Sequence, residues 1–493
     1  MFINKKTIFY ILLFSILGIL SIILFVFPQK SNENLNANDL HKEFKQDFDF
    51  LYKEIRDNYV NLEYTEARYN FKWNDLYKRY KIEIAKAKTY KEFYKICTQY
   101  TSYLHDGHLR FSWIPSGVGK RLLEDHFLIR RAISLSLVED KVIITESIDK
   151  EILGQEVIKI NGIPIQEILE VMMKHYYIAT DDYQTKARLL YRNLYLDYFD
   201  LYFDEYPASL IFEIMRPGNK ISQFTLATEE ESYHNQPSHN LAPFLIEDRS
   251  RLPYGKIIDN RFGYIKIPTF SGKAKEITDA FRKLAIRFKN KGVQAAIIDL
   301  RGNGGGNCAR EILGFLAPTK IIKNRYRYKN TDRFKKLYGI GRLLYEDLRS
   351  PSFKENLEKG YTKWWGWVLT PKKENYLTSI PVAVIYDDLI FSDGIGFVTT
   401  CRNLELAKII GPSMELTNHG LTKPVTLPGK HFSIAYSVME FRKPDYSYDE
   451  YLEPDIEVRS SLDDLYKGKD TVLETAIAYL QGLNYNDKEQ YGK

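Results

Sequence analysis

The chain has 493 residues, of which 44% are hydrophobic and 27% charged, an ordinary composition for a globular protein of two or three domains. Its net charge of +6 is small for this length and does not by itself indicate a nucleic-acid partner. The cysteines Cys97, Cys308 and Cys401 lie far apart without CxxC or metal-type spacing. We therefore expect no disulfide framework, and at least one buried thiol.

The N-terminus predicts a membrane anchor over residues 1–28. Lys5 and Lys6 precede an uncharged apolar run from Ile8 to Phe27, long enough to span a bilayer as a helix. The positive flank would stay in the cytoplasm and place the rest of the chain outside it. A cleaved signal peptide is the alternative, but the run is long for one, and no small-x-small cleavage site follows it. We expect a single-pass protein of the cell membrane with extracytoplasmic domains.

A polar tether is expected over 29–39, followed by a helical domain over 40–118. Apolar residues recur every three or four positions from Leu40 to Ile55, which predicts one buried helical stripe. Similar patterns continue through Trp73 and Phe93. The motif Asp106-Gly107-His108 follows these helices, and residues 109–113 alternate as a strand does.

Residues 119–228 predict a small α+β domain. Strands are expected over 132–138, 141–146, 156–160 and 208–215, with a helix over 165–175 and a tight turn at Asn161-Gly162. The sequence GQEVIKINGIPIQEIL resembles part of a PDZ domain, a fold that binds an extended peptide at a sheet edge. The alternative is an α+β domain without a peptide groove.

After a polar linker over 229–258, the pattern changes to strands and helices in alternation over 259–480, with a polar tail over 481–493. Strands are expected over 262–267, 293–300 and 382–386, and a helix over 274–289. The near-continuous apolar strands predict a largely parallel α/β sheet.

An insertion over 320–379 is rich in Tyr, Trp and basic residues. Basic and aromatic residues together can bind nucleic acid, but an extracytoplasmic position argues against that partner. A partly ordered flap over a cleft, or a surface facing anionic lipid, fits better.

Two turns carry the candidate chemistry. The glycine cluster from Arg301 to Asn307 matches neither the dinucleotide nor the P-loop pattern, so we expect no cofactor there; its backbone N–H groups can approach a ligand closely. Ser392 lies between an apolar strand and a helix, where its hydroxyl could act as a nucleophile beside the N–H groups of the helix N-terminus. Alternatively, Ser392 is only a helix cap.

Taken in order, these motifs resemble the C-terminal-processing (tail-specific) serine peptidases, a family that includes the tricorn protease core. The resemblance covers roughly Leu40 to Val458 and is carried by Asp106-Gly107-His108, the PDZ-like segment, the Ser392 turn and the signature IIDLRGNGGG of residues 297–306. It implies a Clp/crotonase-like α/β catalytic domain that hydrolyses peptides or unfolded proteins, with Ser392 as nucleophile.

The resemblance implies one of two general bases. Processing peptidases use a Lys beyond the serine, but counting places Thr417 there, and Lys423 would substitute only in a longer loop. Tricorn-like members use a histidine that matches His108, whose neutral imidazole suits general-base work near pH 7. His419 is the second-choice histidine. We therefore expect His108 to be the base.

The remaining site residues also follow from the resemblance. An orienting carboxylate is expected at Glu450, with Asp449 as the alternative candidate, and the oxyanion hole at the N–H of Asp393 with that of Gly304 or Gly305. The family usually has Ser-Ala-x-Glu at the nucleophile, whereas this chain has Ser392-Asp393-Gly394-Ile395. That departure keeps open a catalytically inactive, peptide-binding scaffold.

Other residues receive no catalytic role. Asp299 and Arg301 are expected to hold the glycine turn in shape, and His105 to be a surface or supporting residue. The remaining histidines show no HExxH-type spacing, so no metal site is expected. They are His126, His175, His234, His239 and His431.

Overall fold

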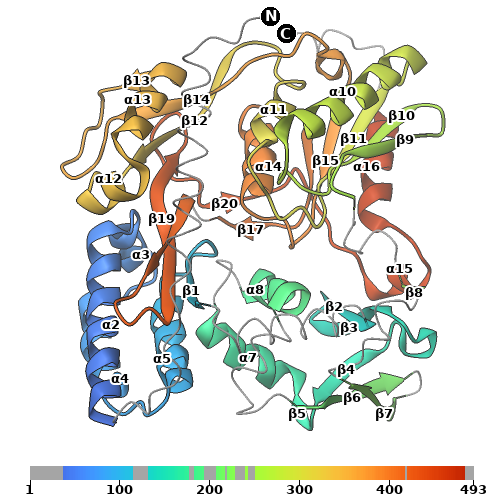
Figure 1. Cartoon of the computed structure of the whole chain (residues 1–493). Coiled ribbons are helices and arrows are strands. Elements are labelled where there is room, and N and C mark those ends of the chain that lie inside the picture. The colour runs from blue at the N-terminus through green and yellow to red at the C-terminus, as the bar shows by residue number, and fades with distance from the viewer. Residues whose placement is uncertain are drawn as a thin grey trace, which may run out of the picture.

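The computed structural model describes residues 37–114, 132–176, 182–193, 207–216, 219–227, 239–241, 250–416 and 419–483. Three parts are visible in Figure 1: helices packed beside an antiparallel sheet, a parallel sheet covered by helices, and a smaller α+β unit beneath it in that view.

The predicted N-terminal helical region is confirmed. Its helices are α2 (Ala37–Asn58), α3 (Leu62–Arg68), α4 (Trp73–Ile84) and α5 (Tyr90–Ser102). The predicted stripe of α2 is fully buried at Phe44, Phe48, Leu51 and Ile55, because it faces the other helices and the antiparallel sheet. The first helix begins at Ala37, inside the predicted tether.

An antiparallel sheet adjoins these helices, with strand order β1-β19-β12-β14-β13 and β18 on the other side of β19. Its strands are β1 (Arg110–Trp113), β12 (Ile321–Tyr328), β13 (Ser352–Phe353), β14 (Trp364–Leu369), β18 (His419–Thr426) and β19 (Phe432–Arg442). The insertion over 320–379 thus supplies three strands, together with α12 (Asp332–Tyr338), α13 (Ile340–Arg349) and η5 (Tyr376–Ser379). The expectation of a partly ordered flap was wrong, because β12 and β14 pair within one continuous sheet and at least half of their residues are buried.

The second sheet has the order β21-β16-β15-β11-β10-β9 and is parallel except for β9. Its strands are β9 (Tyr254–Ile258), β10 (Phe262–Lys266), β11 (Ala295–Asp299), β15 (Val382–Ile385), β16 (Lys408–Gly411) and β21 (Ile456–Glu457). Every residue of β11 and β15 is buried, as expected for a parallel sheet covered on both faces. The predicted α/β architecture is confirmed, but β9 lies within the predicted linker.

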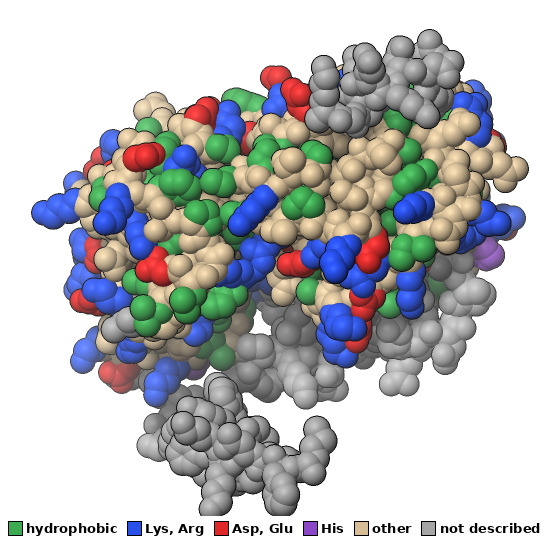
Figure 2. Space-filling model, turned by 90° about the horizontal axis from the view of Figure 1, so that it is seen from above, with side chains coloured by type: hydrophobic (Ala, Val, Ile, Leu, Met, Phe, Trp, Pro, Cys, Tyr) green, Lys and Arg blue, Asp and Glu red, His purple; other side chains and the backbone are tan. Residues whose placement is uncertain are grey.

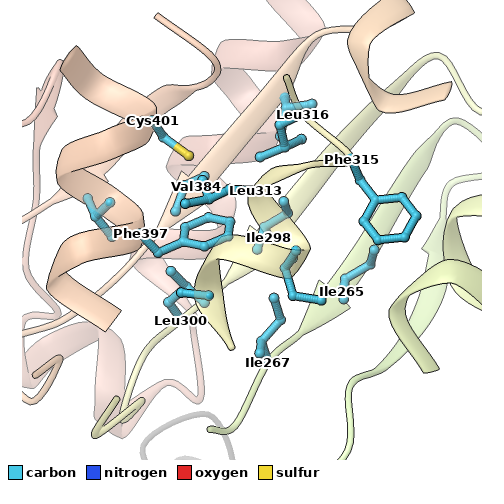
Figure 3. Packing of buried hydrophobic residues seen from close by; sticks show 14 of the residues in the cluster. Ile265, Ile267, Ile298, Leu300, Leu313, Phe315, Leu316, Val384, Phe397 and Cys401 are labelled. Carbon is cyan, nitrogen blue, oxygen red and sulfur yellow. The ribbon is translucent and has the colours of Figure 1, made fainter. Parts of the chain in front are cut away.

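Helices cover both faces of this sheet. On one face lie α10 (Ala274–Lys291), α11 (Ala309–Leu313) and α14 (Asp393–Asn403); on the other lies α16 (Thr471–Gly482), preceded by α15 (Leu462–Tyr466). Figure 3 shows Phe397 of α14 pointing toward Ile298 and Leu300, which belong to the same buried cluster. This packing fixes α14, and therefore Ser392 at its start, against the ends of the central strands.

The α+β unit has the strand order β2-β3-β4-β6-β7, with β5 beside β4 and β8 beside β3. Its elements are β2 (Ile133–Val138), β3 (Lys141–Ser147), η1 (Lys150–Ile152), β4 (Glu156–Ile160), β5 (Ile163–Pro164), α7 (Ile165–His175), α8 (Asp182–Arg188), η2 (Leu189–Asn193), β6 (Ser209–Arg216), β7 (Lys220–Ala227) and β8 (His239–Asn240). The predicted tight turn is confirmed, since Asn161 and Gly162 both have positive φ between β4 and β5.

Within the described residues no helix is both long and apolar enough to cross a membrane. The predicted anchor over 8–27 lies outside the described residues, as do His126, His234 and Thr417. Figure 2 shows one face of the molecule, over which Lys and Arg side chains are dispersed among acidic and apolar ones.

Candidate active site

Ser392 lies at the sharp turn between β15 and α14. Its φ of 52° and ψ of −119° are unusual for a residue with a side chain and mark a strained backbone. Ser392 occupies the N-cap position of α14, but its side chain makes no capping hydrogen bond. The hydroxyl is therefore directed away from the helix, as a nucleophile requires.

His108 reaches this hydroxyl from the segment between α5 and β1. Its Nε2 lies 3.0 Å from Ser392 Oγ, within hydrogen-bond reach. The imidazole stacks on the Phe391 ring with 4.7 Å between centroids. The serine and histidine are 284 positions apart in the sequence, so two different sheets must pack together to bring them into contact.

Asp106 supports His108 from two residues upstream. Its buried carboxylate accepts a hydrogen bond from the His108 backbone N–H at 2.8 Å, and the same Oδ1 lies 3.8 Å from His108 Nδ1. That second distance is too long for a hydrogen bond, but the negative charge favours a proton on Nδ1. With Nδ1 protonated, Nε2 is free to accept the serine proton. Burial, together with the nearby Asp106 carboxylate, raises the pKa of Tyr59 well above its ordinary value.

The glycine turn packs directly against the nucleophile turn. Gly305 has a φ of +92°, and a Cβ there would lie 2.7 Å from both Phe391 O and Ser392 Cβ. Phe391 N–H donates to Asn303 O at 3.0 Å, which joins the two turns through their backbones. A Cβ on Gly394 would lie only 2.9 Å from Asn303 O. The close approach therefore depends on glycine on both sides.

The candidate oxyanion donors Gly304 and Gly305 differ in the hydrogen bonds that their N–H groups make. Gly305 N–H donates to the Asn303 side chain at 2.8 Å, so the prediction of Gly305 as a donor conflicts with its geometry. Gly304 N–H makes no hydrogen bond to the part of the chain that the structure describes. The N–H of Asp393 likewise has no described acceptor at the start of α14. Gly304 and Asp393 are the pair left for an oxyanion.

Asp299 and Arg301 form a buried ion-pair network behind the glycine turn. Arg301 pairs with Asp299 and with Asp470, the N-cap residue of α16, both at 2.6 Å. Lys266 donates to Asp299 at 3.1 Å and to Arg301 O at 2.6 Å. These cations hold the pKa of Asp299 well below its usual range although burial opposes them. The network fixes the strand ends from which the turn departs.

Comparison with known proteins agrees with this geometry. The sequence pattern described as "Peptidase family S41" matches residues 261–458, and that of the "Tricorn protease C1 domain" matches residues 40–102. The first match contains the glycine turn and Ser392, and the second contains most of α2 and all of α3, α4 and α5. The chain therefore carries a peptidase family S41 domain. It is a serine-type peptidase of the C-terminal-processing group.

Solved structures share the peptidase's fold. "Structure of mature CPAF complexed with lactacystin" has a TM-score of 0.66 at 15% identity and covers 91% of this chain and 100% of that one. "Crystal Structure of mature CPAF" has a TM-score of 0.65 at 14% identity and covers 91% and 98%. At these identities the likeness concerns the fold, which is α/β and consistent with a Clp/crotonase-like catalytic domain. No curated protein matches the sequence.

Several residues that were predicted to belong to the site make their described contacts away from Ser392. Glu450 accepts a hydrogen bond from Tyr64 at 2.8 Å, and its described contacts do not include His108. Asp449 accepts from Asn403 at 2.9 Å. Lys423 donates to Leu337 O at 2.8 Å, at the end of α12, and not to Ser392. His419 opens β18, where it is paired with Glu440 in the strand register.

Two other histidines, His105 and His175, pack against neighbouring residues and have no assigned catalytic role. His105 stacks on Tyr69 at 3.9 Å between centroids, and burial lowers its pKa to about 4, so it is not a surface residue. His175 contacts Thr98 and Lys95 O, with a pKa that burial also lowers to about 4. Among the described residues no group of three or more His, Cys, Asp or Glu could hold a metal ion.

Sequence reasoning missed several residues near the nucleophile. Arg188 of α8 is buried, donates to Ile390 O and lies 4.8 Å from the Phe391 ring centroid. Asp106 was noted only as part of a motif, although an Asp two residues before a candidate base is a recognisable signal for a supporting carboxylate. Arg188 had no such signal, because its role depends on how α8 packs.

Proposed function

We propose that this peptidase is a membrane-anchored, extracytoplasmic serine endopeptidase that cleaves peptides or unfolded proteins through an acyl-enzyme. Ser392 is the nucleophile and His108 the general base. One observation carries the proposal: the 3.0 Å separation of His108 Nε2 and Ser392 Oγ, in a chain that carries a peptidase family S41 domain. A serine hydroxyl is a weak nucleophile at neutral pH and requires such a base.

In the first half-reaction, Ser392 Oγ attacks the carbonyl carbon of the scissile peptide bond while its proton passes to His108 Nε2. The tetrahedral intermediate collapses, the C–N bond breaks, and His108 returns the proton to the leaving amine. Water then repeats the sequence on the ester, with His108 taking the water proton and returning it to Ser392 Oγ. The strained turn at Ser392 supports this role because it presents Oγ outside the helix.

The developing oxyanion is assigned to the N–H groups of Asp393 and Gly304. Both belong to the turns that pack against each other around Gly305, so the donors are held before substrate arrives. Fixed donors of this kind stabilise charge only as it develops, and loss of one typically costs 10²- to 10³-fold in kcat. The two carboxylates proposed to orient His108 are Asp106, by proximity, and Glu450, by family resemblance.

The α+β unit is proposed to bind peptide as a PDZ-like domain. Its strand β2 lies at the edge of the sheet and is paired with β3. However, α8 and η2 pack beside β2 and α7, with Ala187, Leu189 and Leu190 buried in the same cluster. An added peptide strand must therefore use the remaining edge of β2 or displace this segment.

The catalytic proposal is tested on the full-length chain, purified in mild detergent, with unfolded fluorescently labelled casein as substrate. Wild type should release peptides, and Ser392→Ala should lower the rate by roughly 10⁴-fold or more at unchanged melting temperature. If wild type and Ser392→Ala are equally inactive, the chain is a non-catalytic scaffold. Inhibition by lactacystin, which CPAF binds in its solved complex, offers an independent probe of Ser392.

The location is tested separately in cells. A C-terminal fusion to a reporter enzyme active only outside the cytoplasm should be active, and removal of residues 1–28 should abolish that activity. A fusion that is inactive while the full-length protein accumulates would contradict the proposed orientation.

A further inference from the structure

The side chain of Asp393 connects the two turns that carry the proposed oxyanion donors. Its backbone N–H is one donor, at the first residue of α14. Its carboxylate Oδ2 accepts a hydrogen bond from Ala309 N–H at 2.8 Å, immediately after the glycine turn that carries Gly304. One residue therefore supplies a donor and also holds the segment that supplies the other. An alanine, the usual family residue at this position, would have no such second function.

Lys323 lies beside the first turn of α14, next to Gly396. It belongs to β12, where the pairing with β14 shifts register between Ile322 and Asn324. Lys323 is the extra residue of this irregularity, and bulges of this kind redirect a side chain. The side chain is 4% exposed, and its Nζ lies 3.5 Å from Gly396 O and 4.5 Å from the Trp367 ring centroid. The insertion thus delivers a buried cation to the base of α14.

Gly396 lies beside both charged groups. A Cβ at this position would lie 3.8 Å from Lys323 Nζ and 3.9 Å from Asp393 Oδ1. Both groups therefore adjoin the same side of the helix's first turn, with no side chain from residue 396 between them.

The electrostatics of the two groups are mutually dependent. Burial raises the pKa of Asp393, while Lys323, the Ala309 N–H and Arg310 lower it. Burial lowers the pKa of Lys323 to about 8; Asp393 and Cys401 oppose that effect, and Arg310 adds to it. Each charge is costly alone in this surrounding and is stabilised by the other. Below pH 8 Lys323 is therefore mainly an ammonium ion, and its charge favours the ionised form of Asp393.

We propose that Asp393 and Lys323 form a positioning pair that fixes the spacing of the two oxyanion donors. The ammonium keeps Asp393 ionised, and the ionised carboxylate holds Ala309, and with it the glycine turn, against the start of α14. This inference rests on the proposed function, because it requires Asp393 and Gly304 to bind an oxyanion. It extends that function by giving the insertion a part in catalysis.

The test compares Asp393→Ala, Asp393→Asn, Lys323→Met and the double variant Asp393→Ala/Lys323→Met. Each is assayed for kcat, KM, melting temperature and inhibition by a peptide aldehyde, whose carbonyl oxygen becomes an oxyanion when Ser392 adds to it. Lys329→Met is the matched control, because this half-buried lysine beyond β12 donates to Tyr59 O and does not contact α14.

Asp393→Ala and Lys323→Met should each lower kcat by about 10- to 100-fold, less than complete loss of a donor, with KM within about 3-fold. Aldehyde affinity should fall in parallel with kcat. Asp393→Asn, which keeps an acceptor for Ala309, should lose less. The double variant should be no worse than the poorer single variant, because the groups act as one unit. In wild type, kcat should fall above pH 8 as Lys323 loses its proton; in Lys323→Met this fall should be absent.

Several results would contradict the proposal that Asp393 and Lys323 act as a positioning pair. One is a Ser392-dependent wild-type activity that Asp393→Ala leaves unchanged. Another is a loss confined to melting temperature, or one equalled by Lys329→Met. If the alanine variant fails to fold, an unaltered kcat and pH profile in Asp393→Asn and Lys323→Met decides against the proposal. A wild type without Ser392-dependent activity refutes the proposed function itself, which distinguishes the two failures.

Discussion

The two halves of the candidate site are built in different ways. The nucleophile half, Ser392 with the glycine turn, lies at the ends of β11 and β15 in one parallel sheet, and backbone contacts hold it. The base half, His108 with Asp106, comes from the segment before β1 in the antiparallel sheet. Its attachment to the nucleophile half runs through side chains: the bond to Ser392 and the stack on Phe391.

This difference predicts two kinds of sensitivity. A backbone-built turn fails when a Cβ is added where none fits, because neither chain segment can move without losing its hydrogen bonds. The base half, which side chains hold in place, should lose activity when its charge or ring contacts are removed. The fold around it should remain intact. Activity and stability should therefore separate in the base half and fall together in the nucleophile half.

The largest effect is expected from removing the base. His108→Ala should lower kcat/KM by roughly 10³-fold or more, since Ser392 would lose its proton acceptor. The melting temperature should change little, because His108 is held by a loop and contributes no buried apolar side chain to the core. Peptide hydrolysis and thermal unfolding measure the two quantities.

Lys423→Ala is the control for that result. Lys423 donates to Leu337 O at the surface, so its removal should leave kcat/KM within about 2-fold. A retained activity in His108→Ala together with a loss in Lys423→Ala would assign the base to the lysine and overturn the arrangement proposed here.

The second effect tests the nucleophile half. Gly305→Ala should lower kcat by about 10²-fold and also reduce stability, because the added Cβ would lie 2.7 Å from Phe391 O and Ser392 Cβ. Gly302→Ala is the matched control from the same turn: its φ is +70°, but nothing lies within 4 Å of its Cβ position. It should cost about 1 kcal/mol of strain and little activity. Equal effects of both substitutions would show that conformational strain matters and the close approach does not.

The third effect tests how the base is oriented. Asp106→Asn keeps an acceptor for His108 N–H but removes the charge 3.8 Å from Nδ1, and should lower kcat/KM by about 10- to 100-fold. Glu450→Gln should cost less, since Glu450 contacts Tyr64. Both proteins should fold, as measured by circular dichroism. A larger loss in Glu450→Gln would return the orienting role to Glu450, as the family resemblance implies.

These halves also differ in how far the sequence predicts them. Apolar runs such as 293–300 predict β11 and β15 within two residues, and the turn residues around Ser392 predict that a helix follows it, because local periodicity and glycine placement determine these elements. His108 was accessible only through family resemblance, since no local pattern joins residues 284 positions apart.

Contacts that depend on packing between distant elements could not be predicted. The pairing of β12 with β19 joins residues more than 100 positions apart, and the register shift at Lys323 arises from the pairing of β12 with β14, about 40 positions further along the chain. The partner of Glu450 is set by α3, from the opposite end of the chain. In the same way, Gly305 was interchangeable with Gly304 in the sequence, and only the hydrogen bond that Gly305 N–H donates to the Asn303 side chain distinguishes them.

The smallest effect is expected from substituting Asp387. Its carboxylate supports the glycine turn by accepting a hydrogen bond from Gly302 N–H at 2.9 Å. Burial raises the pKa of Asp387 to about 6. Between pH 4 and 6 the folded protein therefore binds more protons at this site than the unfolded chain, so its contribution to stability falls as pH rises. Asp387→Asn stays neutral and keeps an acceptor. The melting temperature of Asp387→Asn minus that of wild type should therefore increase by about 2–4 °C when the pH is raised from 4 to 7.

Asp332→Asn, at a fully exposed carboxylate, should show no such pH-dependent gain over wild type. If Asp387→Asn behaves like this control, the carboxylate is not destabilised when ionised, and Gly302 N–H alone offsets its burial. In that case the glycine turn is stabilised by charge as well as by backbone contacts, and the contrast between the two halves is weaker than the close approach at Gly305 suggests.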